Sequence, residues 1–297
     1  MPTTAAPLET NPANGRREEP ASSPPTDGRK ALREGTVDEV LRGTAGWCVV
    51  HGDALHVLRD LPDSCVSAFV TDPPYSSGGA FRGDRVKETT AKYVSTNSAN
   101  KGIPAFEGDV RDQRSFTLWS ALWSSEAWRA GVDGCHLVAF SDWRQLPALC
   151  DALQAGGWLW RGIAAWDKTE ASRPRNGGFR AQCEFMAWVT RGPFAETGVY
   201  LDGCFRVLAD RDKLHQAVKP LALMERLVTI APAGGLIVDP FAGSGTTVAA
   251  ALRQGRRVLG IEISREWAEL ARERVRADAS GSDYAALLRG QQALFSR

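Results

Sequence analysis

Four consecutive residues, Asp72-Pro73-Pro74-Tyr75, combine groups that could bind and activate a planar amine. Two adjacent prolines stiffen the backbone and leave it without N–H donors. What remains are two acceptors, the Asp72 carboxylate and the Pro73 carbonyl, beside the aromatic face of Tyr75. A ring amine is a poor nucleophile, but fixed acceptors that draw its hydrogens out of the ring plane favour a localised lone pair. The motif predicts direct group transfer to such an amine, without a catalytic cysteine.

A second stretch, from Asp239 to Thr247, reads Asp-Pro-Phe-Ala-Gly-Ser-Gly-Thr-Thr and could bind a nucleotide-like ligand. Gly243 and Gly245 permit a tight turn and let a ligand approach bare backbone. The helix that follows offers free N–H groups and a positive dipole end to an anionic group. Glu262 ends the next predicted strand, where a carboxylate can accept hydrogen bonds from both hydroxyls of a ribose. The spacing fits neither Gly-x-Gly-x-x-Gly nor a phosphate-binding Gly-Lys-Ser/Thr loop.

Both motifs stand at the ends of predicted strands. The continuous apolar run 66–70 is typical of a strand buried on both faces, and it leads directly into Asp72. Because strands alternate with helices, we expect a Rossmann-like, doubly wound α/β domain with a mostly parallel sheet. Ligands bind such sheets at the carboxyl ends of the strands. The other predicted strands are 47–50, 136–140, 158–166, 183–189, 235–238 and 258–261, and the predicted helices are 55–61, 117–129, 143–155, 220–230, 246–254 and 265–277.

Bulk composition narrows the class of protein. The 297 residues suffice for one sizeable domain, or one domain with an insertion. The net charge of +1 means that any nucleic-acid contact must use local positive charge. The six cysteines form no Cys-x-x-Cys pair and the four histidines show no metal-binding spacing, so we expect reduced thiols and no metal. No apolar run suggests a membrane span or a signal peptide, so a cytoplasmic protein is expected.

The predicted organisation has three parts. Residues 1–42, rich in Pro, Ala, Thr, Ser, Glu and Arg, are expected to form a disordered tail. The domain is expected to span 43–280, followed by a C-terminal extension at 281–297. Within the domain, residues 76–115 show no regular pattern, and so long a loop is usually functional or mobile.

Taken together, the motifs resemble those of the amino-methylating DNA methyltransferases. In that family Asp-Pro-Pro-Tyr is the catalytic motif and Phe-x-Gly-x-Gly is the cofactor motif. The catalytic motif comes first here, which resembles the beta order, with a target-recognition region between the two, expected at 167–215. The segments 52–55 and 215–224 resemble two further cofactor motifs of the family, so that the likeness covers residues 47–75 and 213–276.

The resemblance implies the S-adenosylmethionine-dependent methyltransferase fold, S-adenosylmethionine as the cofactor and DNA as the partner. A surface lysine at a helix start is an alternative interpretation of Lys219, and a solvated surface is an alternative for the arginines. The implied catalytic or base-binding residues are Asp72, Pro73, Pro74 and Tyr75; the implied cofactor contacts are Asp53, Ala54, Lys219, Asp239, Phe241, Ala242, Gly243, Ser244, Gly245, Thr246 and Glu262; and the candidate DNA contacts in the two loops are Arg82, Arg85, Arg173, Arg175 and Arg180.

The expected reaction is methylation of adenine N6 in a specific DNA sequence, after the base has been flipped from the duplex at a cost of a few kcal/mol. By resemblance, Asp at position 72 favours adenine, whereas Ser would favour N4 of cytosine, the nearest alternative. Methylation of RNA or of a protein amide, a dehydrogenase, and a non-catalytic DNA-binding module with a relic cofactor pocket are more distant interpretations. A prokaryotic or phage origin is expected. The recognition sequence, the oligomeric state (a homodimer is one option) and the presence of a companion restriction enzyme stay open.

Overall fold

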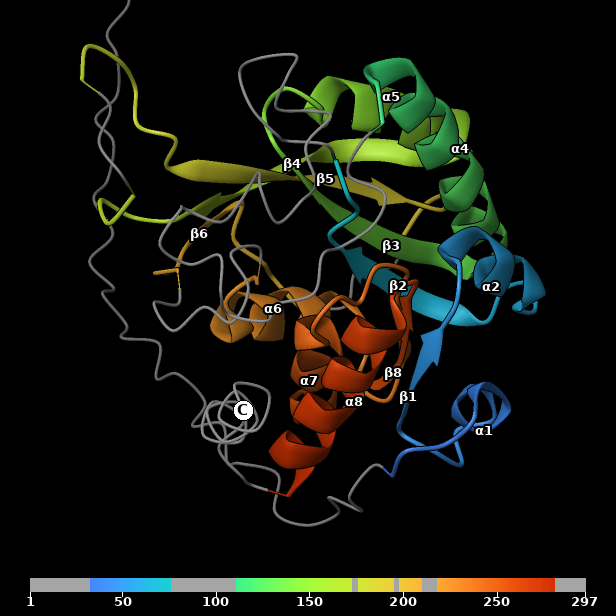
Figure 1. Cartoon of the computed structure of the whole chain (residues 1–297). Helices are drawn as coiled ribbons and strands as arrows, with labels where there is room; N and C mark the ends of the chain where they lie inside the picture. Colours follow the sequence, from blue (N-terminus) through green and yellow to red (C-terminus); the bar gives the residue numbers. More distant parts are fainter. Residues whose placement is uncertain (1–32, 76–110, 173–175, 195–197, 210–217, 281–297) are drawn as a thin grey trace, which may run out of the picture. The chain divides into compact units, whose positions relative to one another are not determined.

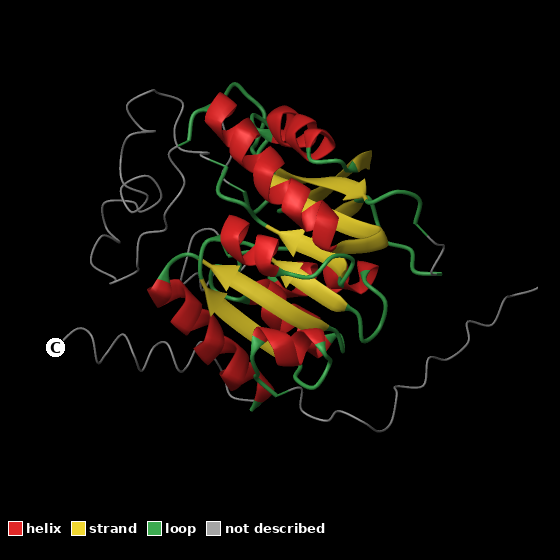
Figure 2. Cartoon of the chain, turned by 90° about the vertical axis from the view of Figure 1, so that its right-hand side faces the viewer, coloured by secondary structure: helices red, strands yellow, loops and turns green. Residues whose placement is uncertain are grey.

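The structure, a computed structural model, describes residues 33–75, 111–172, 176–194, 198–209 and 218–280. These residues form one eight-stranded sheet with helices on both faces (Figures 1 and 2). The strand order is β1-β8-β7-β2-β3-β5-β4-β6. The strands are β1 (Trp47–His51), β2 (Val66–Thr71), β3 (Gly131–Ser141), β4 (Leu159–Asp167), β5 (Cys183–Thr190), β6 (Cys204–Arg206), β7 (Leu236–Asp239) and β8 (Arg257–Glu262). The helices are α1 (Val37–Leu41), α2 (Ala54–Asp60), α4 (Gln113–Ala130), α5 (Leu146–Ala155), α6 (Leu221–Leu227), α7 (Thr246–Arg253) and α8 (Arg265–Ala279), with a 3-10 turn at Val228–Ile230.

The sheet is mostly parallel, as predicted, and β5 is the exception. It runs antiparallel to both β3 and β4. The described residues between β4 and β5 form no helix, and parallel neighbours would have needed a long crossover between them. Because β4 is therefore parallel to β3 and β2, the segment after β4 leaves the sheet at the same edge as the end of β2.

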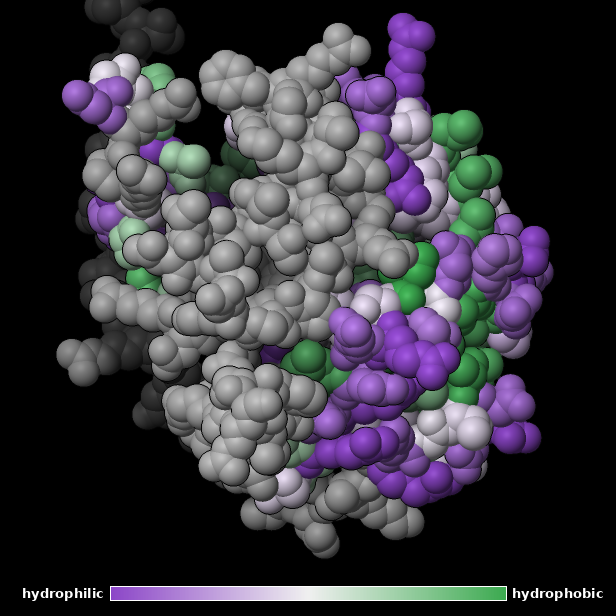
Figure 3. All heavy atoms as spheres, in the orientation of Figure 1, coloured by the Kyte–Doolittle hydropathy of each residue, from purple (hydrophilic) through white to green (hydrophobic). Residues whose placement is uncertain are grey.

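The sheet lies between two apolar cores, one on each face. Val66 and Phe69 of β2 face α2, α4 and α5, whereas Ala68 and Val70 face α6, α7 and α8, so the strand is buried on both faces as its sequence predicts. The charged helix α8 keeps Ala268, Ala271 and Ala277 inward, and the side of the molecule that carries it is mostly hydrophilic (Figure 3). Within the described ranges no helix has the length and apolar character that a membrane span requires.

The connections diverge between β7 and β2. From β7 the chain passes through α7 to β8, which is the neighbour of β7 away from β2. From β2 it passes through α4 to β3, which is the neighbour of β2 away from β7. In open α/β sheets this reversal leaves a crevice at the carboxyl ends of the strands, where ligands bind. The two motifs therefore leave the sheet at its topological switch point.

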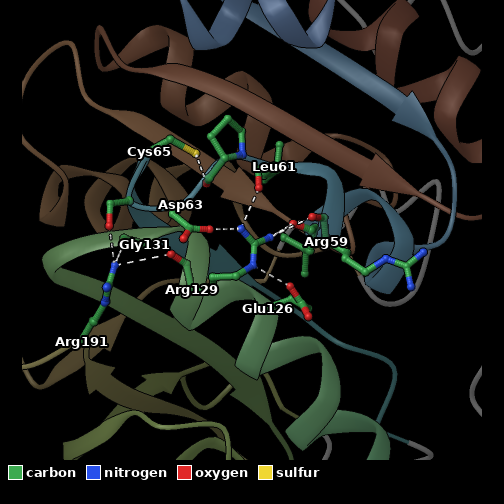
Figure 4. Close-up of polar contacts among 11 residues, drawn as sticks. Arg59, Leu61, Asp63, Cys65, Glu126, Arg129, Gly131 and Arg191 are labelled. Atoms are coloured by element: carbon green, nitrogen blue, oxygen red, sulfur yellow. Dashed lines mark hydrogen bonds and ion pairs between the residues drawn. The ribbon is translucent and has the colours of Figure 1, made fainter.

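An arginine clasp fixes the chain just before β2 (Figure 4). Arg129, near the end of α4, donates hydrogen bonds to the backbone carbonyls of Leu58 (2.9 Å), Arg59 (3.0 Å) and Leu61 (2.8 Å). Its guanidinium also pairs with Asp63. The clasp gives a charged donor to carbonyls at the C-terminal end of α2, among them that of Leu58, which also accepts from the Leu61 N–H, and it ties α2 to α4.

Two predicted boundaries are wrong. The expected tail reaches too far, because Thr36 caps α1 in a capping box with Glu39, and Val40 is only 1% exposed in the core. A five-residue helix with one buried side chain gives no periodic signal, which explains the miss. Helix α4 begins at Gln113, inside the predicted loop 76–115. Residues 1–32, 76–110 and 281–297 lie outside the described residues, and the three-residue strand β6 was not predicted.

Candidate active site

The two motifs meet at adjacent strand ends. Strands β2 and β7 pair in parallel, with Phe69 opposite Val238. Past the pairing, the Thr71 hydroxyl donates a 2.6 Å hydrogen bond to Oδ1 of Asp239. Asp72 and the glycine loop therefore start from the same edge of the sheet, although 167 positions separate Asp72 from Asp239 in the chain.

Asp239 joins the two strand ends. Its Oδ1 also accepts a hydrogen bond from the Phe241 backbone N–H (3.0 Å), and the side chain is buried. Burial raises the pKa of Asp239 to about 6, against the lowering effect of hydrogen bonds from Thr247, Thr71 and Phe241. In this structure the carboxylate positions the glycine loop, and its predicted contact with a cofactor stays a prediction.

The two glycines of the loop serve different needs. Both have a left-handed backbone, with φ of +50° at Gly243 and +78° at Gly245. A Cβ on Gly245 would lie 2.9 Å from the Cβ of Ala271, so the residue is small because α8 packs against it. A Cβ on Gly243 would meet no described heavy atom within 4 Å. Gly243 therefore presents bare backbone to open space, which is where a ligand could approach.

Glu262 fastens the loop to the end of β8. Its Oε2 accepts from the Gly243 N–H and its Oε1 from the Ser264 N–H, both at 2.9 Å. Burial raises the pKa of Glu262, and these backbone hydrogen bonds oppose the rise. Since the two oxygens of a carboxylate offer about four lone-pair sites, Glu262 keeps acceptor capacity for a ligand hydroxyl beside these backbone donors.

Helices on both faces of the sheet support the same loop. From α8, Arg274 donates to the hydroxyls of Ser244 (3.1 Å) and Thr246 (2.6 Å). From α4, Trp123 packs edge-on against Phe241, with ring centroids 5.4 Å apart. Ala242 is buried, and its N–H bonds to the carbonyl that precedes Glu262 in β8. The loop is thus held from both sides with Gly243 at its open tip.

The end of β1 adjoins this loop. The Gly52 N–H donates to the backbone carbonyl of Glu262 (2.9 Å). Asp53 caps α2 by accepting from the N–H groups of Leu55 (3.0 Å) and His56 (3.2 Å), and Ala54 is buried as the first helical residue. The structure therefore brings Asp53, Ala54 and Glu262 to one corner of the sheet edge.

Asp72 has one engaged oxygen and one free oxygen. Its Oδ2 lies 2.5 Å from the Lys219 ammonium, whereas its Oδ1 is buried and has no hydrogen-bond partner among the described residues. Burial raises the pKa of Asp72 to about 6; Lys219 lowers it, and Glu184 and Asp239 raise it further. Pro73 is buried, and Pro74 and Tyr75 are partly buried. A buried acceptor without a partner is costly, so its retention here fits a substrate donor.

Lys219 is not a surface lysine. It is 6% exposed, and its Nζ lies between the carboxylates of Asp72 and Glu184, 3.2 Å from Oε2 of the latter. Burial lowers the pKa of Lys219, but Asp72, Tyr75 and Glu184 outweigh that effect and raise it well above its usual value. The structure thus places Lys219 on Asp72 of the Asp-Pro-Pro-Tyr motif; its predicted contact with a cofactor stays a prediction.

Sequence reasoning missed Glu184. It lies in β5 between Cys183 and Phe185, inside an otherwise apolar run, where a single acid gives the only signal. Its Oε1 accepts a 3.1 Å hydrogen bond from Lys168, which follows β4. Burial raises the pKa of Glu184, but Lys219 and Lys168 outweigh burial and lower it.

The candidate DNA contacts are only partly described. Arg180 donates to the backbone carbonyl of Glu170, and its neighbour Phe179 is 98% exposed. This loop lies between β4 and β5, at the edge of the sheet where Asp72 follows β2. Arg82, Arg85, Arg173 and Arg175 lie outside the described residues. No group of His, Cys, Asp or Glu in the described part of the chain is arranged to hold a metal ion.

Comparisons with known proteins point to DNA methylases. A family model described as "DNA methylase" (N6_N4_Mtase) matches residues 196–273. The chain is 27% identical over 229 residues to the protein YubD of Escherichia coli (strain K12), which covers 77% of this chain and 89% of YubD. It is 26% identical over 260 residues to the DNA adenine methyltransferase YhdJ of the same strain, and the aligned region covers 78% of this chain and 84% of YhdJ.

Solved structures share the fold. TTHA0409 of Thermus thermophilus superposes with a TM-score of 0.59 at 22% identity, covering 79% of this chain and 96% of that one. The cytosine-N4-specific PvuII DNA methyltransferase superposes with a TM-score of 0.56 at 15% identity, covering 83% and 94%. At these identities the likeness shows the fold alone.

Proposed function

Because the chain belongs to the family of amino-methylating DNA methyltransferases, whose methyl donor is S-adenosylmethionine, we propose that it methylates the N6 amine of adenine in a specific DNA sequence. The observation that carries the proposal is the free Oδ1 of Asp72. It is a buried acceptor without a partner among the described residues, one strand away from a glycine loop whose tip is open. An acceptor beside an open cofactor loop suits the transfer of a methyl group to an amine.

The residues present fit the cofactor. The bare backbone of Gly243 and the remaining lone pairs of Glu262 suit a ligand that carries a ribose. Asp53 and Phe241 lie along the same edge and would complete its binding. When bound, S-adenosylmethionine supplies an electrophilic methyl group on a sulfonium.

The chain's own residues prepare the amine. The Asp72 carboxylate and the Pro73 carbonyl accept its two hydrogens, which favours a tetrahedral nitrogen with a localised lone pair. Transfer forms the nitrogen–carbon bond and breaks the sulfur–carbon bond, and the nitrogen then loses one proton. Oδ1 of Asp72 can take that proton because its pKa of about 6 lies close to a working pH near neutrality.

The base must leave the duplex to reach this edge. Flipping costs a few kcal/mol, and stacking on an aromatic ring recovers part of it. Tyr75, which follows the acceptors directly, supplies the ring. We propose that the region 167–215 recognises the target, with Arg180 among its contacts to the phosphates.

Adenine is preferred over cytosine for two reasons. The first motif residue is Asp72, which by family resemblance favours adenine, and the relative YhdJ is named as an adenine methyltransferase. N4 of cytosine presents the same amine chemistry to the same acceptors. Methylation of cytosine is therefore the alternative result that the experiment must distinguish.

The test is long-read sequencing of DNA from cells that express the chain. We expect N6-methyladenine in one sequence context, and no modification with Asp72→Ala. Purified Asp72→Ala should still bind S-adenosylmethionine in a calorimetric titration, because it leaves the glycine loop intact. Asp133→Ala, which removes an exposed carboxylate near the start of β3, is the matched control and should methylate normally.

Three outcomes would contradict the proposal. N4-methylcytosine would move the product to the alternative base. Methyl transfer by Asp72→Ala would remove Asp72 from the chemistry. Binding of the cofactor and DNA by the wild-type chain, with no transfer to any DNA, would indicate a non-catalytic binding module.

A further inference from the structure

Four charged side chains form a row behind the catalytic motif. Lys168 lies 3.1 Å from Oε1 of Glu184, Lys219 lies 3.2 Å from Oε2 of Glu184, and Lys219 lies 2.5 Å from Oδ2 of Asp72. The signs alternate along the row, with two ammonium groups and two carboxylates. Only Asp72 and Lys219 fall within motifs that the family resemblance covers.

The row crosses the sheet from one segment to the next. Lys168 follows β4, Glu184 belongs to β5, Lys219 precedes α6, and Asp72 follows β2. The antiparallel direction of β5 is what brings Glu184, near the start of its strand, to the edge where β2 ends. The arrangement therefore depends on the part of the fold that the cofactor motifs do not determine.

Burial makes each pairing consequential. Lys219 is almost completely buried, and the side chains of the other three are 22–24% exposed. A buried charge is costly unless it is paired. Lys219 has two carboxylates within 3.2 Å, so its ammonium is attracted to Glu184 as well as to Asp72.

We propose that Glu184 is a positioning residue of methyl transfer, which holds the Lys219 ammonium on Oδ2 of Asp72 so that Oδ1 stays free for the substrate amine. The inference rests on the proposed function and adds to it a residue outside the motifs. Lys219 is the link: one side of its ammonium is fixed by Glu184, and the other side fixes the catalytic carboxylate.

The two neighbours of Asp72 act on its basicity in opposite directions. Lys219 lowers the pKa of Asp72, and the negative charge of Glu184 raises it. Removing the charge of Glu184 should therefore lower the pKa of Asp72, and removing that of Lys219 should raise it. Among the described residues, the other titratable groups that face Asp72 are Asp239 from β7 and Tyr75 from its own motif, and neither variant alters them.

The experiment uses the full chain with Glu184→Gln, Glu184→Asp and Lys219→Met, and a DNA that contains the sequence found by the sequencing experiment. For Glu184→Gln we expect kcat to fall about 10- to 100-fold, the loss of one hydrogen bond to a charged group. The acid limb of its kcat profile should move to lower pH, and the KM for S-adenosylmethionine should stay near the wild-type value. Glu184→Asp should restore part of kcat.

Lys219→Met should move the acid limb to higher pH, the opposite direction. Asp133→Asn, which alters an exposed carboxylate near the start of β3, is the control and should leave kcat and the profile unchanged. A merely structural role would lower kcat in both variants without opposite shifts of the profile.

Carbon-13 NMR titration of the Asp72 carboxyl group gives a readout that does not need activity. The inference is overturned if Glu184→Gln leaves both kcat and the Asp72 titration unchanged, or if both variants shift Asp72 in the same direction. If the wild-type chain methylates no DNA, the proposed function fails, and the NMR titration still decides whether Glu184 controls Asp72. A variant that fails to fold would show it by circular dichroism, and Glu184→Asp, which keeps the charge but shortens the side chain that reaches Lys219, then tests the contact through kcat and the Asp72 titration.

Discussion

Substituting alanine for each glycine of the cofactor loop should separate ligand binding from stability. A left-handed backbone costs an L residue about 1–2 kcal/mol, so Gly243→Ala and Gly245→Ala share that penalty. At Gly245 the new Cβ would also lie 2.9 Å from the Cβ and 3.1 Å from the Cα of Ala271. Overpacking of this kind adds about 1–3 kcal/mol. The expected loss of unfolding free energy is about 2–5 kcal/mol for Gly245→Ala and about 1–2 kcal/mol for Gly243→Ala.

The loss of ligand affinity should follow the reverse order, with Gly243→Ala more affected than Gly245→Ala. The Cβ at Gly243 projects into open space, where the cofactor would approach bare backbone. We expect Gly243→Ala to raise the Kd for S-adenosylmethionine at least about tenfold, which corresponds to about 1.4 kcal/mol. Gly234→Ala is the matched control: Gly234 has φ of +71° and open space around it but precedes β7 at the far end of the strand.

Urea unfolding and calorimetric titration of the three variants measure both quantities. The control should lose about 1–2 kcal/mol of stability, as a left-handed alanine does, and bind the cofactor as the wild type does. Wild-type affinity in Gly243→Ala would refute the assignment of that tip as the approach side. Equal destabilisation by Gly243→Ala and Gly245→Ala would refute the role given to the contact with α8.

Three further predictions follow from single contacts. The kcat of the wild-type chain should fall as pH drops through about 6, because the Asp72 acceptor is lost when the carboxyl group is protonated. Incorporation of tritium-labelled methyl groups, followed in steps of about half a pH unit, measures this profile, and a flat profile between pH 5 and 7 would contradict the prediction. Arg129→Met should lower the unfolding free energy by about 2–4 kcal/mol in urea, since three backbone carbonyls lose a charged donor; a loss under about 1 kcal/mol would show that water replaces the guanidinium. Val40→Ala should cost about 1–3 kcal/mol by the same assay, whereas no change would place α1 outside the cooperative fold.

The sequence predicts the elements that carry their signal locally. The apolar run of β2, the glycine loop after β7 and the strand that ends at Glu262 all match the structure to within a residue or two. Parallel packing then predicts that Asp72 and Gly243 share an edge, and the Thr71–Asp239 hydrogen bond agrees. Each of these inferences needs only the chain's own periodicity and the rule that ligands bind at strand ends.

The remaining features depend on distant partners. Nothing near Lys219 in the sequence distinguishes a buried ammonium from a surface lysine, because its partners come from β2 and β5. Glu184 gives no motif, and its place at the site follows from the antiparallel direction of β5. The short helix α1 is ordered by contacts of Val40 with the rest of the core rather than by its own pattern.

Three carboxylates at the ends of β2, β7 and β8 show how similar groups can take different roles. Asp239 and Glu262 accept hydrogen bonds from the protein itself: the former from a hydroxyl and a backbone N–H, the latter from two backbone N–H groups. Asp72 is bound on one oxygen by a buried ammonium, and its other oxygen has no partner among the described residues. A fold selected for stability alone would gain by satisfying that oxygen, because an unpaired buried acceptor costs about 1–3 kcal/mol. The carboxylate with the unmet acceptor is therefore the one to assign to the chemistry, and the two satisfied carboxylates are the ones that shape the loop beside it.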